Sequence, residues 1–410
     1  MNVRITANTV ERTTYLNWIE SLRDKHVIKV VTGVRRSGKS TLLKLYRQRL
    51  VAQGIPEQRI ITVDLDLFEN EELREKHALH QYVLSRMQPD GMNYIFIDEA
   101  QRCPGFEDAV ESLYARDFTD VYVTGSNAHM LSSELATLLS GRFMTIPVLP
   151  LSFAEFSLAS TEPDTQRRFY QYLEWGGFPE MLHFADNPQS MSSYLEGVYN
   201  TVLVNDVSER HAIRDMTALK RISRYMFAHA GSLVSANKIQ GALTSAGHKI
   251  SQPTVDNYID YLTDGMLFYE AQRYNLKGKD YLKSLAKYYA VDTGLRNYVT
   301  GYRSEDIGHM VENIVYLELI RRRYPVLVGN IEGREVDFVV KEQYANAYIQ
   351  VALTIHDAET LNRETASLRA IGGYEPRYIF ALDTPATSSE DGIRYVNIID
   401  WLLGKDTVLP

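Results

Sequence analysis

One short stretch limits what this chain can fold into more than any other: residues 33–40 read GVRRSGKS, the pattern G-x-x-x-x-G-K-S. It follows an apolar run at residues 27–31 and precedes a helical pattern that begins at Thr41. Gly33 and Gly38 allow a tight turn whose backbone N–H groups, with the positive end of the next helix, can bind phosphate oxygens. Because strand, loop and helix occur together, we interpret this P-loop as a nucleotide site rather than a glycine-rich turn.

Two side chains of the motif have distinct expected roles. Lys39 can reach the β- and γ-phosphates of a nucleotide, and the Ser40 hydroxyl can ligate Mg²⁺. The expected cofactors are therefore ATP and Mg²⁺. The candidate cofactor-binding residues of the loop are Gly33, Arg35, Arg36, Ser37, Gly38, Lys39, Ser40 and Thr41.

Length and composition set broad limits on the rest of the chain. The 410 residues exceed one core of usual size and predict about three domains. No apolar run approaches the ~18 residues of a membrane span. Because residues 1–10 lack an apolar signal core and Cys103 is the single cysteine, we expect a cytoplasmic protein without a membrane partner. The net charge of −8 argues against a uniformly basic nucleic-acid binder, although a local basic patch stays open.

A later strand pattern carries two carboxylates at its end. Residues 93–97 read NYIFI and are followed by Asp98 and Glu99. Ligands bind at the carboxyl ends of strands in open α/β sheets, so we expect Asp98 to lie near the Mg²⁺ held by Ser40. Glu99 can then orient and deprotonate the attacking water. The alternative is a strand followed by a helix cap, because aspartate commonly caps helices, and the upstream P-loop favours the metal site.

Two further polar residues are candidates for the catalytic site. A strand at residues 121–124 precedes Ser126 and Asn127. Asn127 is the candidate for touching the γ-phosphate or holding the water, with Ser126 as the fallback and a plain turn as the alternative. Arg142 precedes a strand at residues 144–148. We expect its guanidinium on the phosphate side of the sheet, where it can stabilise transition-state charge in its own or a neighbouring subunit; the alternative is an ordinary surface arginine.

Together these patterns resemble the AAA+ superfamily of P-loop NTPases. With a strand at residues 60–65, the resemblance implies an α/β fold whose five parallel strands have the order 5-1-4-3-2. More narrowly, the chain is similar to the archaeal-type ATPases related to signal-transduction NTPases. The motifs that carry this likeness are GVRRSGKS at 33–40, FIDE at 96–99, TGSN at 124–127, GRF at 141–143 and LPLSFAEF at 149–156.

The resemblance covers the whole chain and implies four modules. They are an ATPase core at 1–155, a helical lid at 156–230, a winged helix at 231–300 and a nuclease-like domain of unknown function at 301–410. Relatives carry a Gly-Gly-x-Pro turn close to the adenine, which implies that Gly177 and Pro179 help to close the nucleotide site. The residues alone predict only a turn between two helices here.

Residues 231–300 have the outline of a winged helix. Helical patterns at 235–246 and from Ser251 to Leu262 precede a β-ribbon formed by residues 266–270 and 287–291. Residues 273–287 contain five basic residues and one acidic residue, which suits contact with DNA phosphates. The candidate contacts are Arg273, Lys277, Lys279 and Lys283. The second helix carries three acidic residues that would repel DNA, so packing against the ATPase is the alternative; these are Asp256, Asp260 and Asp264.

Strand patterns at residues 335–340 and 348–353 resemble the core of PD-(D/E)xK nucleases. In that core, acidic residues hold Mg²⁺ and a lysine stabilises developing charge. Asp337 matches the first acidic position, but Gln350 at the second is a neutral amide and Ala352 fills the lysine position. Lys341 could move in from the neighbouring strand. We therefore expect an inactive nuclease-like domain that serves in binding or assembly.

The preferred hypothesis is an AAA+-type enzyme that binds and hydrolyses ATP with Mg²⁺ and acts on or near DNA. The alternative from another class is a nucleotide-dependent switch or scaffold with little turnover, whose nuclease-like domain recognises a partner. An active DNA nuclease is a third hypothesis, which the missing lysine disfavours. DNA contact through the winged helix or the C-terminal domain, a protein partner and a homo-oligomer all stay open.

Overall fold

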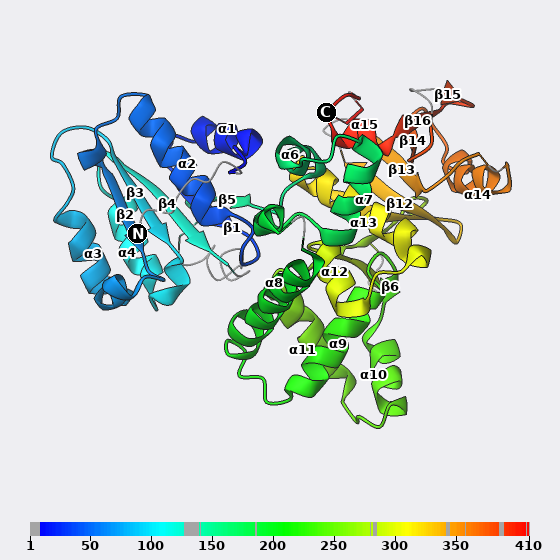
Figure 1. Ribbon diagram of the computed structural model, residues 1–410, viewed down its shortest axis with the longest axis horizontal. Coiled ribbons are helices and arrows are strands. Elements are labelled where there is room, and N and C mark those ends of the chain that lie inside the picture. The colour runs from blue at the N-terminus through cyan, green and yellow to red at the C-terminus, as the bar shows by residue number, and fades with distance from the viewer. Residues whose placement is uncertain are drawn as a thin grey trace. The chain divides into compact units, whose positions relative to one another are not determined.

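The chain divides into two compact units in a computed structural model (Figure 1). The first comprises Met1–Val148 with Asp264–Met266, and the second comprises Leu149–Thr263 with Leu267–Pro410. Within the described residues, we find no helix with the length and apolar character needed to cross a bilayer. The structure describes residues 9–126, 139, 141–184, 187–278, 280–281, 285–341, 345–356, 358–384, 389–406 and 408–409.

The first unit is built on a five-stranded sheet in which every pairing is parallel. From one edge to the other the strands are β5 (Phe143–Pro147), β1 (Ile28–Thr32), β4 (Thr119–Gly125), β3 (Asn93–Asp98) and β2 (Ile60–Asp64). This order reads 5-1-4-3-2, so the predicted P-loop NTPase sheet is confirmed. Because the strands are parallel, their carboxyl ends share one edge of the sheet.

Helices cover both faces of this sheet because successive strand residues point to opposite sides. In β3, Tyr94 and Phe96 pack on one face with α1 and α2, whereas Ile95 and Ile97 pack on the other face with α3 and α4. The helices of this unit are α1 (Thr13–Ser21), α2 (Lys39–Ala52), α3 (Lys76–Leu84) and α4 (Phe106–Tyr114). Short helical turns occur at η1 (Glu57–Arg59), η2 (Phe68–Arg74) and η3 (Ala100–Arg102).

The second unit begins with a set of helices. The first of them starts where Ser152 and Glu155 cap each other: each side chain accepts a bond from the other residue's backbone N–H, at 2.8 and 3.1 Å. Later in the chain, α12 packs against α7, α8 and α9. The helical elements are α6 (Phe153–Ala159), α7 (Thr165–Trp175), η5 (Pro179–His183), α8 (Pro188–Thr201), η6 (Val202–Ser208), α9 (Met216–Ala228) and α12 (Thr293–Thr300).

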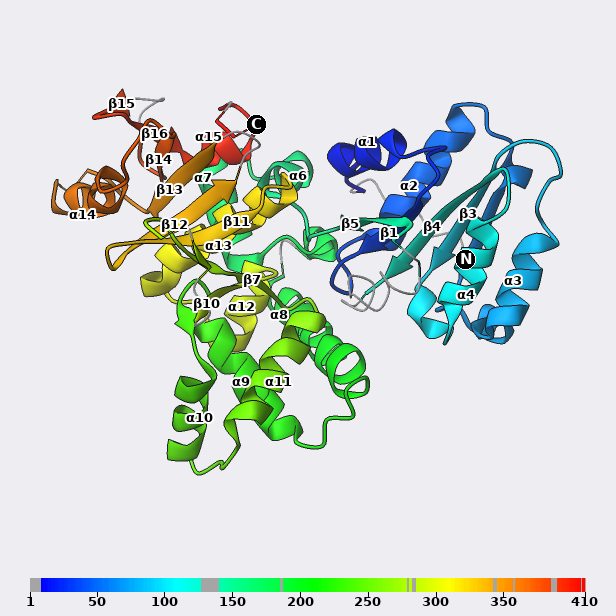
Figure 2. The same ribbon diagram turned by 180° about the vertical axis from the view of Figure 1, so that it is seen from behind.

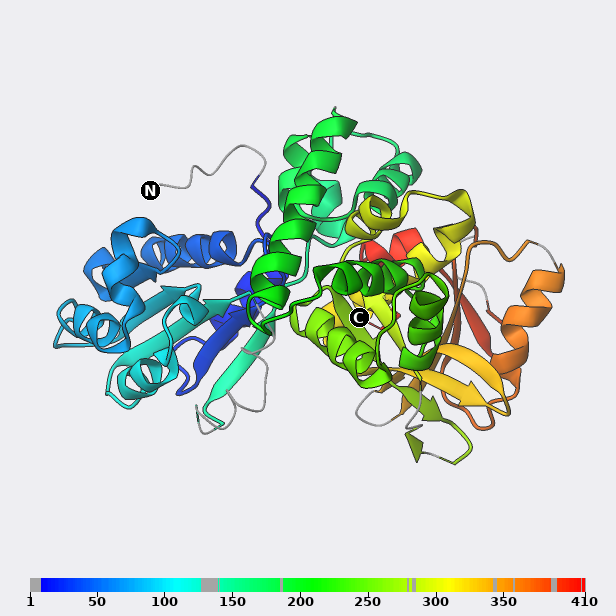
Figure 3. The same cartoon turned by 90° about the horizontal axis from the view of Figure 1, so that it is seen from below.

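Two helices and a small sheet follow α9, as the sequence predicts (Figure 3). The sheet has the order β6-β10-β7 and is antiparallel. The elements are β6 (Leu233–Val234), α10 (Ala236–Ser245), α11 (Gln252–Asp264), β7 (Phe268–Ala271) and β10 (Ala286–Ala290). The hairpin β8 (Arg273–Asn275) and β9 (Asp280–Tyr281) between β7 and β10 belongs to a different sheet.

The third sheet is mixed and has the order β15-β16-β14-β13-β12-β11-β8-β9 (Figure 2). Its face with Phe338 packs against α13, and its face with Val339 packs around Leu368 of α14. Since Arg273 of β8 pairs with Val328 of β11, this sheet crosses the module boundary expected at residue 300. The remaining elements are η7 (Ser304–Asp306), α13 (Ile307–Arg321), β11 (Val326–Ile331), β12 (Arg334–Lys341), β13 (Asn346–Ala352), α14 (Ala358–Arg369), β14 (Arg377–Ala381), β15 (Ser389–Glu390), β16 (Ile393–Asn397) and α15 (Ile398–Leu402).

Candidate functional site

The loop between β1 and α2 needs its two glycines. Gly33 has φ of 149°, and a Cβ there would lie 2.2 Å from the Val148 carbonyl oxygen. Gly38 has φ of 97° and is the residue from which α2 begins. Arg36 also adopts a left-handed conformation, with φ of 66°, which is strained for a residue with a side chain. The sequence therefore bends the chain sharply just before the amino end of a helix, as a phosphate-binding loop requires.

Polar contacts hold this loop in place. The buried Lys39 ammonium donates to the carbonyl oxygens of Gly33 at 2.9 Å and Val34 at 3.2 Å. The Arg12 guanidinium donates to the Ser37 carbonyl at 3.0 Å. The fully buried Ser37 hydroxyl finds no hydrogen-bond partner among the residues that the structure describes. A buried hydroxyl of this kind suits a loop that receives a polar ligand.

The two carboxylates expected at the end of β3 are positioned by Thr124 of β4. The pairing of Ile97 with Val123 brings Thr124 beside Asp98. The Thr124 hydroxyl donates to the Asp98 carboxylate and accepts the Glu99 backbone N–H at 2.9 Å. The sequence pattern predicts no role for Thr124, which lies opposite Asp98 through the register of β3 and β4.

Glu99 is held in an unusual backbone conformation. Its φ is 53°, and its side chain is only 9% exposed. The Ser126 hydroxyl donates to its carboxylate at 3.2 Å, and the Gln101 amide donates to the same carboxylate and, at 3.1 Å, to Ser126. Strained, over-determined residues often belong to functional sites. Asn127, the preferred candidate for the γ-phosphate contact, lies outside the described residues.

Ser40 and Asp98 line a common cavity of about 300 Å³. Thr41, the last candidate of the loop, also lines it, whereas the sequence predicts no role for Lys44, Arg47, Thr62, Asp64 and Asn70. Arg47 lies two turns after Ser40 on the same face of α2 and donates to the Thr62 hydroxyl at 2.7 Å. Burial raises the pKa of the Asp64 carboxyl and lowers that of Arg47. The lining residues are Ser40, Thr41, Leu43, Lys44, Arg47, Thr62, Asp64, Leu67, Asn70, Phe96 and Asp98.

The placement of Arg142 on the phosphate side of the sheet is wrong. Its carbonyl accepts the Ile28 N–H, so it lies where β1 and β5 start. The P-loop follows the other end of β1, and five residues of strand at ~3.3 Å each separate the two edges. Arg142 is half exposed, and its guanidinium contacts the Glu111 carboxylate at 3.4 Å. The sequence pattern located the strand correctly but not the edge at which it begins.

The glycines of the turn after α7 are explained by close packing inside the second unit. A Cβ on Gly176 would lie 2.2 Å from Asp292 Oδ1, and one on Gly177 would lie 2.3 Å from the Leu151 carbonyl oxygen. The Gly177 N–H donates to Asp292 Oδ2 at 2.7 Å, and its carbonyl accepts the Leu151 N–H at 2.7 Å. Pro179 is the first residue of η5. The predicted turn between helices is therefore present.

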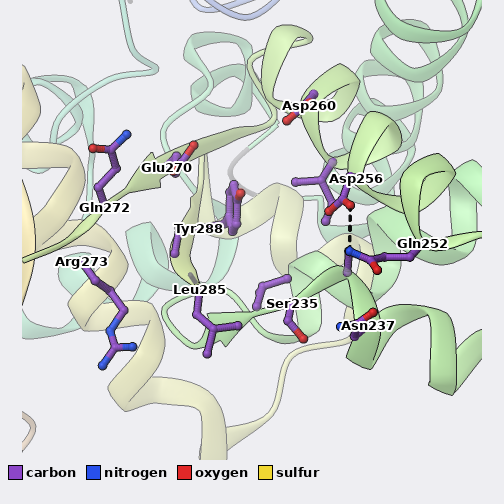
Figure 4. A pocket seen from close by; sticks show the side chains of 14 residues that line it. Ser235, Asn237, Gln252, Asp256, Asp260, Glu270, Gln272, Arg273, Leu285 and Tyr288 are labelled. Carbon is purple, nitrogen blue, oxygen red and sulfur yellow. Dashed lines mark hydrogen bonds between the residues drawn. The ribbon is translucent and has the colours of Figure 1, made fainter. Parts of the chain in front are cut away.

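A second cavity, of about 610 Å³, opens between α10, α11 and the ribbon (Figure 4). Asp256 and Asp260 of α11 line it together with Glu270 of β7 and Arg273. Burial and the Asp260 charge raise the pKa of the Glu270 carboxyl. These acidic side chains oppose phosphate binding on this face.

The basic residues counted in the ribbon do not form one exposed patch. Lys287, one of the five basic residues counted between 273 and 287, is only 3% exposed. The expectation that it belongs to a basic surface is therefore wrong. Lys277 is exposed but lies 3.4 Å from the Glu332 carboxylate. Lys279 and Lys283 lie outside the described residues. Of the four expected DNA contacts, the structure describes Arg273 and Lys277.

Lys287 instead reaches a group of carboxylates. Its ammonium lies 2.9 Å from Glu312 of α13, and 2.6 Å from Glu335 and 3.9 Å from Asp337, both of β12. Lys287, the three acidic residues, Gln350 and Ala352 all line a cavity of about 850 Å³. Lys341 does not enter this group, because its ammonium lies 4.9 Å from the centre of the Tyr274 ring. The lysine near these carboxylates thus comes from β10 rather than from β12 or β13.

Comparison with known proteins identifies the first unit. Residues 25–157 match a family described as an AAA domain, and residues 166–306 match a domain of unknown function. An uncharacterized protein of Methanocaldococcus jannaschii is 28% identical over 337 residues, which are 77% of this chain and 70% of that protein. The Walker-type ATPase of Pyrococcus abyssi has a similar fold, with a TM-score of 0.50 at 16% identity over 71% of this chain and 96% of its own.

An uncharacterized protein of Haemophilus influenzae is similar over almost its whole length. It is 36% identical over 400 residues, which are 96% of this chain and 98% of that protein. Its likeness therefore includes both units. With the P-loop, the parallel sheet and the AAA domain match, the chain belongs, together with this relative, to a family of P-loop ATPases of the AAA+ type.

Proposed function

We propose that the first unit binds ATP with Mg²⁺ and hydrolyses it. The loop from Gly33 to Thr41 binds the phosphates, and Lys39 contacts the β- and γ-phosphates. Ser40 and Asp98 would hold Mg²⁺, which neutralises phosphate charge when bound. Hydroxyl and carboxylate oxygens are the hard donors that Mg²⁺ prefers, and these two residues line the same cavity. This shared cavity is the observation that carries the proposal.

Glu99 is the proposed base for the attacking water. Its carboxylate follows Asp98 directly, and its bonds to Ser126 and Gln101 hold it beside the ends of β3 and β4. A base fixed in this way can accept the water proton without reorganising. Asn127, one residue after Ser126, is proposed to contact the γ-phosphate or the water.

Arg142 is proposed to act outside the nucleotide site of its own chain. Because Arg142 lies at the starting edge of the sheet, we assign it to the nucleotide site of a neighbouring subunit in a homo-oligomer. The segment 156–230 is proposed as a helical lid, with Gly177 and Pro179 in the turn between two of its helical elements. The segment 231–300 is proposed as a winged helix and 301–410 as a nuclease-like domain, to whose sheet the β8–β9 hairpin of the earlier segment also belongs.

Steady-state turnover of purified protein tests the proposal. Multiple turnovers of ATP that need Mg²⁺ are expected from the wild type. Lys39→Ala should abolish nucleotide binding, whereas Glu99→Gln should keep binding and slow turnover by roughly 10²–10⁴-fold. Lys249→Ala and Glu57→Gln change exposed residues of the same types and should leave both properties unchanged. Equal turnover in wild type and Glu99→Gln would refute the assignment of the base.

The second candidate function is a nucleotide-dependent scaffold that recognises a protein partner. The acidic lining at Asp256, Asp260 and Glu270 favours this function over a DNA-bound enzyme. A titration with duplex DNA over a range of salt distinguishes the two. A steep loss of affinity with salt indicates several phosphate contacts and favours DNA, whereas no binding favours the protein partner. A plasmid-nicking assay with Asp337→Ala as the control tests the nuclease hypothesis.

A further inference from the structure

The C-terminal carboxylates do not form the metal site that a nuclease core requires. Gln350 contributes a neutral amide, whose oxygen accepts from the Asp337 N–H and the Ser367 hydroxyl, each at 3.4 Å. Across the described ranges, no three histidine, cysteine, aspartate or glutamate side chains are arranged to hold a metal ion. With Gln350 in place of an acidic residue, the donor set therefore differs from the one that a nuclease metal site uses.

A protein cation already lies among these carboxylates. The Lys287 ammonium contacts Glu312 and Glu335 within 3 Å, and Tyr289 donates to the same Glu312 oxygen at 2.7 Å. Burial would lower the pKa of Lys287, but the charges of Glu312, Asp337 and Glu335 outweigh it and raise that pKa above its ordinary value. The side chain is therefore charged at neutral pH. Burial and the neighbouring Glu312 raise the pKa of Asp337.

We propose that the Lys287 ammonium is the permanent cation of this cluster and stands where a nuclease of the resembled type would hold a divalent metal. The cluster consists of Glu312, Glu335 and Asp337, and it takes up no metal in the native protein. Lys287 does not replace the lysine missing at Ala352 in a catalytic role, because carboxylates engage its ammonium.

The cluster also joins two parts of the second unit. Lys287 belongs to the ribbon strand β10, whereas its partners belong to α13 and β12. The parallel pairing of β8 with β11 links the same ribbon to the same sheet through backbone hydrogen bonds. The ribbon is thus attached at two places, and its lysine serves the fold rather than DNA.

Calcium binding to the full-length, nucleotide-free protein tests this inference. Ca²⁺ accepts oxygen ligands at about 2.3–2.6 Å in flexible geometry, so small shifts of the carboxylates can accommodate it once the ammonium is removed. We expect Lys287→Met to bind one more Ca²⁺ per chain than Lys287→Met/Glu312→Gln in isothermal titration calorimetry. Both variants keep the P-loop and Asp98, so binding there cancels in the comparison.

Wild type and Glu312→Gln provide the second comparison, which does not depend on the folding of Lys287→Met. Equal Ca²⁺ binding by these two proteins supports the proposal. A Ca²⁺ site that wild type has and Glu312→Gln lacks overturns it, as does equal Ca²⁺ binding by Lys287→Met and its double variant. Both comparisons measure Ca²⁺ binding alone, so neither depends on ATP turnover.

Discussion

Each unit of this protein contains a buried lysine and a group of acidic side chains, but the two regions use the charges differently. In the first unit, the Lys39 ammonium donates to loop carbonyls, and the Asp98 and Glu99 carboxylates accept from the hydroxyls of Thr124 and Ser126. In the second unit, Lys287 contacts Glu312 and Glu335 directly.

The difference shows how one set of residue types can serve either ligand binding or stability. Neutral partners hold a charged side chain in position while leaving its charge available to a phosphate or a metal ion. A direct ion pair cancels the charges, and removing one member leaves the other buried and uncompensated. We therefore expect substitutions in the first region to affect activity and substitutions in the second to affect stability.

Lys287→Met should give the largest effect. We expect the free energy of unfolding of the second unit to fall by about 3–5 kcal/mol, because Glu312 and Glu335 lose their cation. Urea denaturation followed by tryptophan fluorescence measures this in a Trp18→Phe background, since Trp175 and Trp401 then report on the second unit alone. The exposed Lys249→Met is the matched control, and equal stability of the two variants would show that the Lys287 ion pairs do not stabilise the second unit.

Asp292 is a buried carboxylate whose contacts among the described residues are backbone N–H groups rather than a lysine, so it tests how burial alone affects stability. Burial raises its pKa to about 6, although the backbone N–H groups of Gly177, Leu295 and Gly294 bind it. An acid whose pKa is raised on folding favours the folded state at low pH, and this advantage disappears as pH rises through the folded-state pKa. Relative to Asp292→Asn, wild type should lose about 3 kcal/mol of stability between about pH 4 and pH 7.

Urea denaturation of both proteins across this pH range measures that difference. The substitution also alters hydrogen bonding to Gly177 and Leu295, but this contribution changes little with pH. The test is therefore how the difference in free energy of unfolding between wild type and Asp292→Asn changes with pH. If wild type instead gains stability relative to Asp292→Asn as pH rises, the raised pKa of Asp292 is contradicted.

Thr124→Val tests whether a neutral hydroxyl positions the carboxylates of the first region. The variant keeps its shape but loses the hydroxyl that holds Asp98 and the Glu99 N–H. Residues that support metal ligands typically contribute 10–100-fold, so we expect Mg²⁺-dependent turnover to fall by roughly that factor. Thr119→Val, at the other end of β4, makes the same change away from the site and should keep turnover near wild type. Comparable losses in both variants would indicate a general effect on the strand.

Arg142→Ala should give the smallest effect on stability and on nucleotide affinity. Its contact with Glu111 is a surface pair, so the free energy of unfolding should change by less than about 1 kcal/mol. The affinity of dilute protein for a fluorescent ATP analogue should also stay near wild type, because the residue lies at the opposite edge of the sheet. A tenfold loss of affinity would contradict this separation of the two edges.

The residues that the sequence placed correctly are those whose position follows from local pattern. The P-loop and the carboxylates of β3 each carry a strand, a turn and a characteristic residue within a few positions. Ser40 and Asp98 could therefore be expected in one place before their common cavity was observed. Thr124 and Gln101 were missed because their role depends on which side chains their neighbours bring beside them.

The placement of Arg142 failed for a different reason. A pattern of apolar residues locates a strand, but the edge at which a residue lies also depends on the direction of that strand. In an all-parallel sheet, a residue before a strand lies far from the loops that follow strands. The parallel sheet that the resemblance to AAA+ proteins implies already places a residue before β5 at the edge opposite the P-loop.

By itself, the sequence determined that this protein has a P-loop fold with its phosphate loop at residues 33–40 and its carboxylates at residues 98 and 99. Tertiary structure alone decided that Lys287 joins Glu312 and Glu335, and that β8 extends a sheet made mainly of later strands. The reason is physical: a glycine-rich turn before a helix is specified by neighbouring residues, whereas a buried ion pair between distant segments exists only where packing brings both charges together.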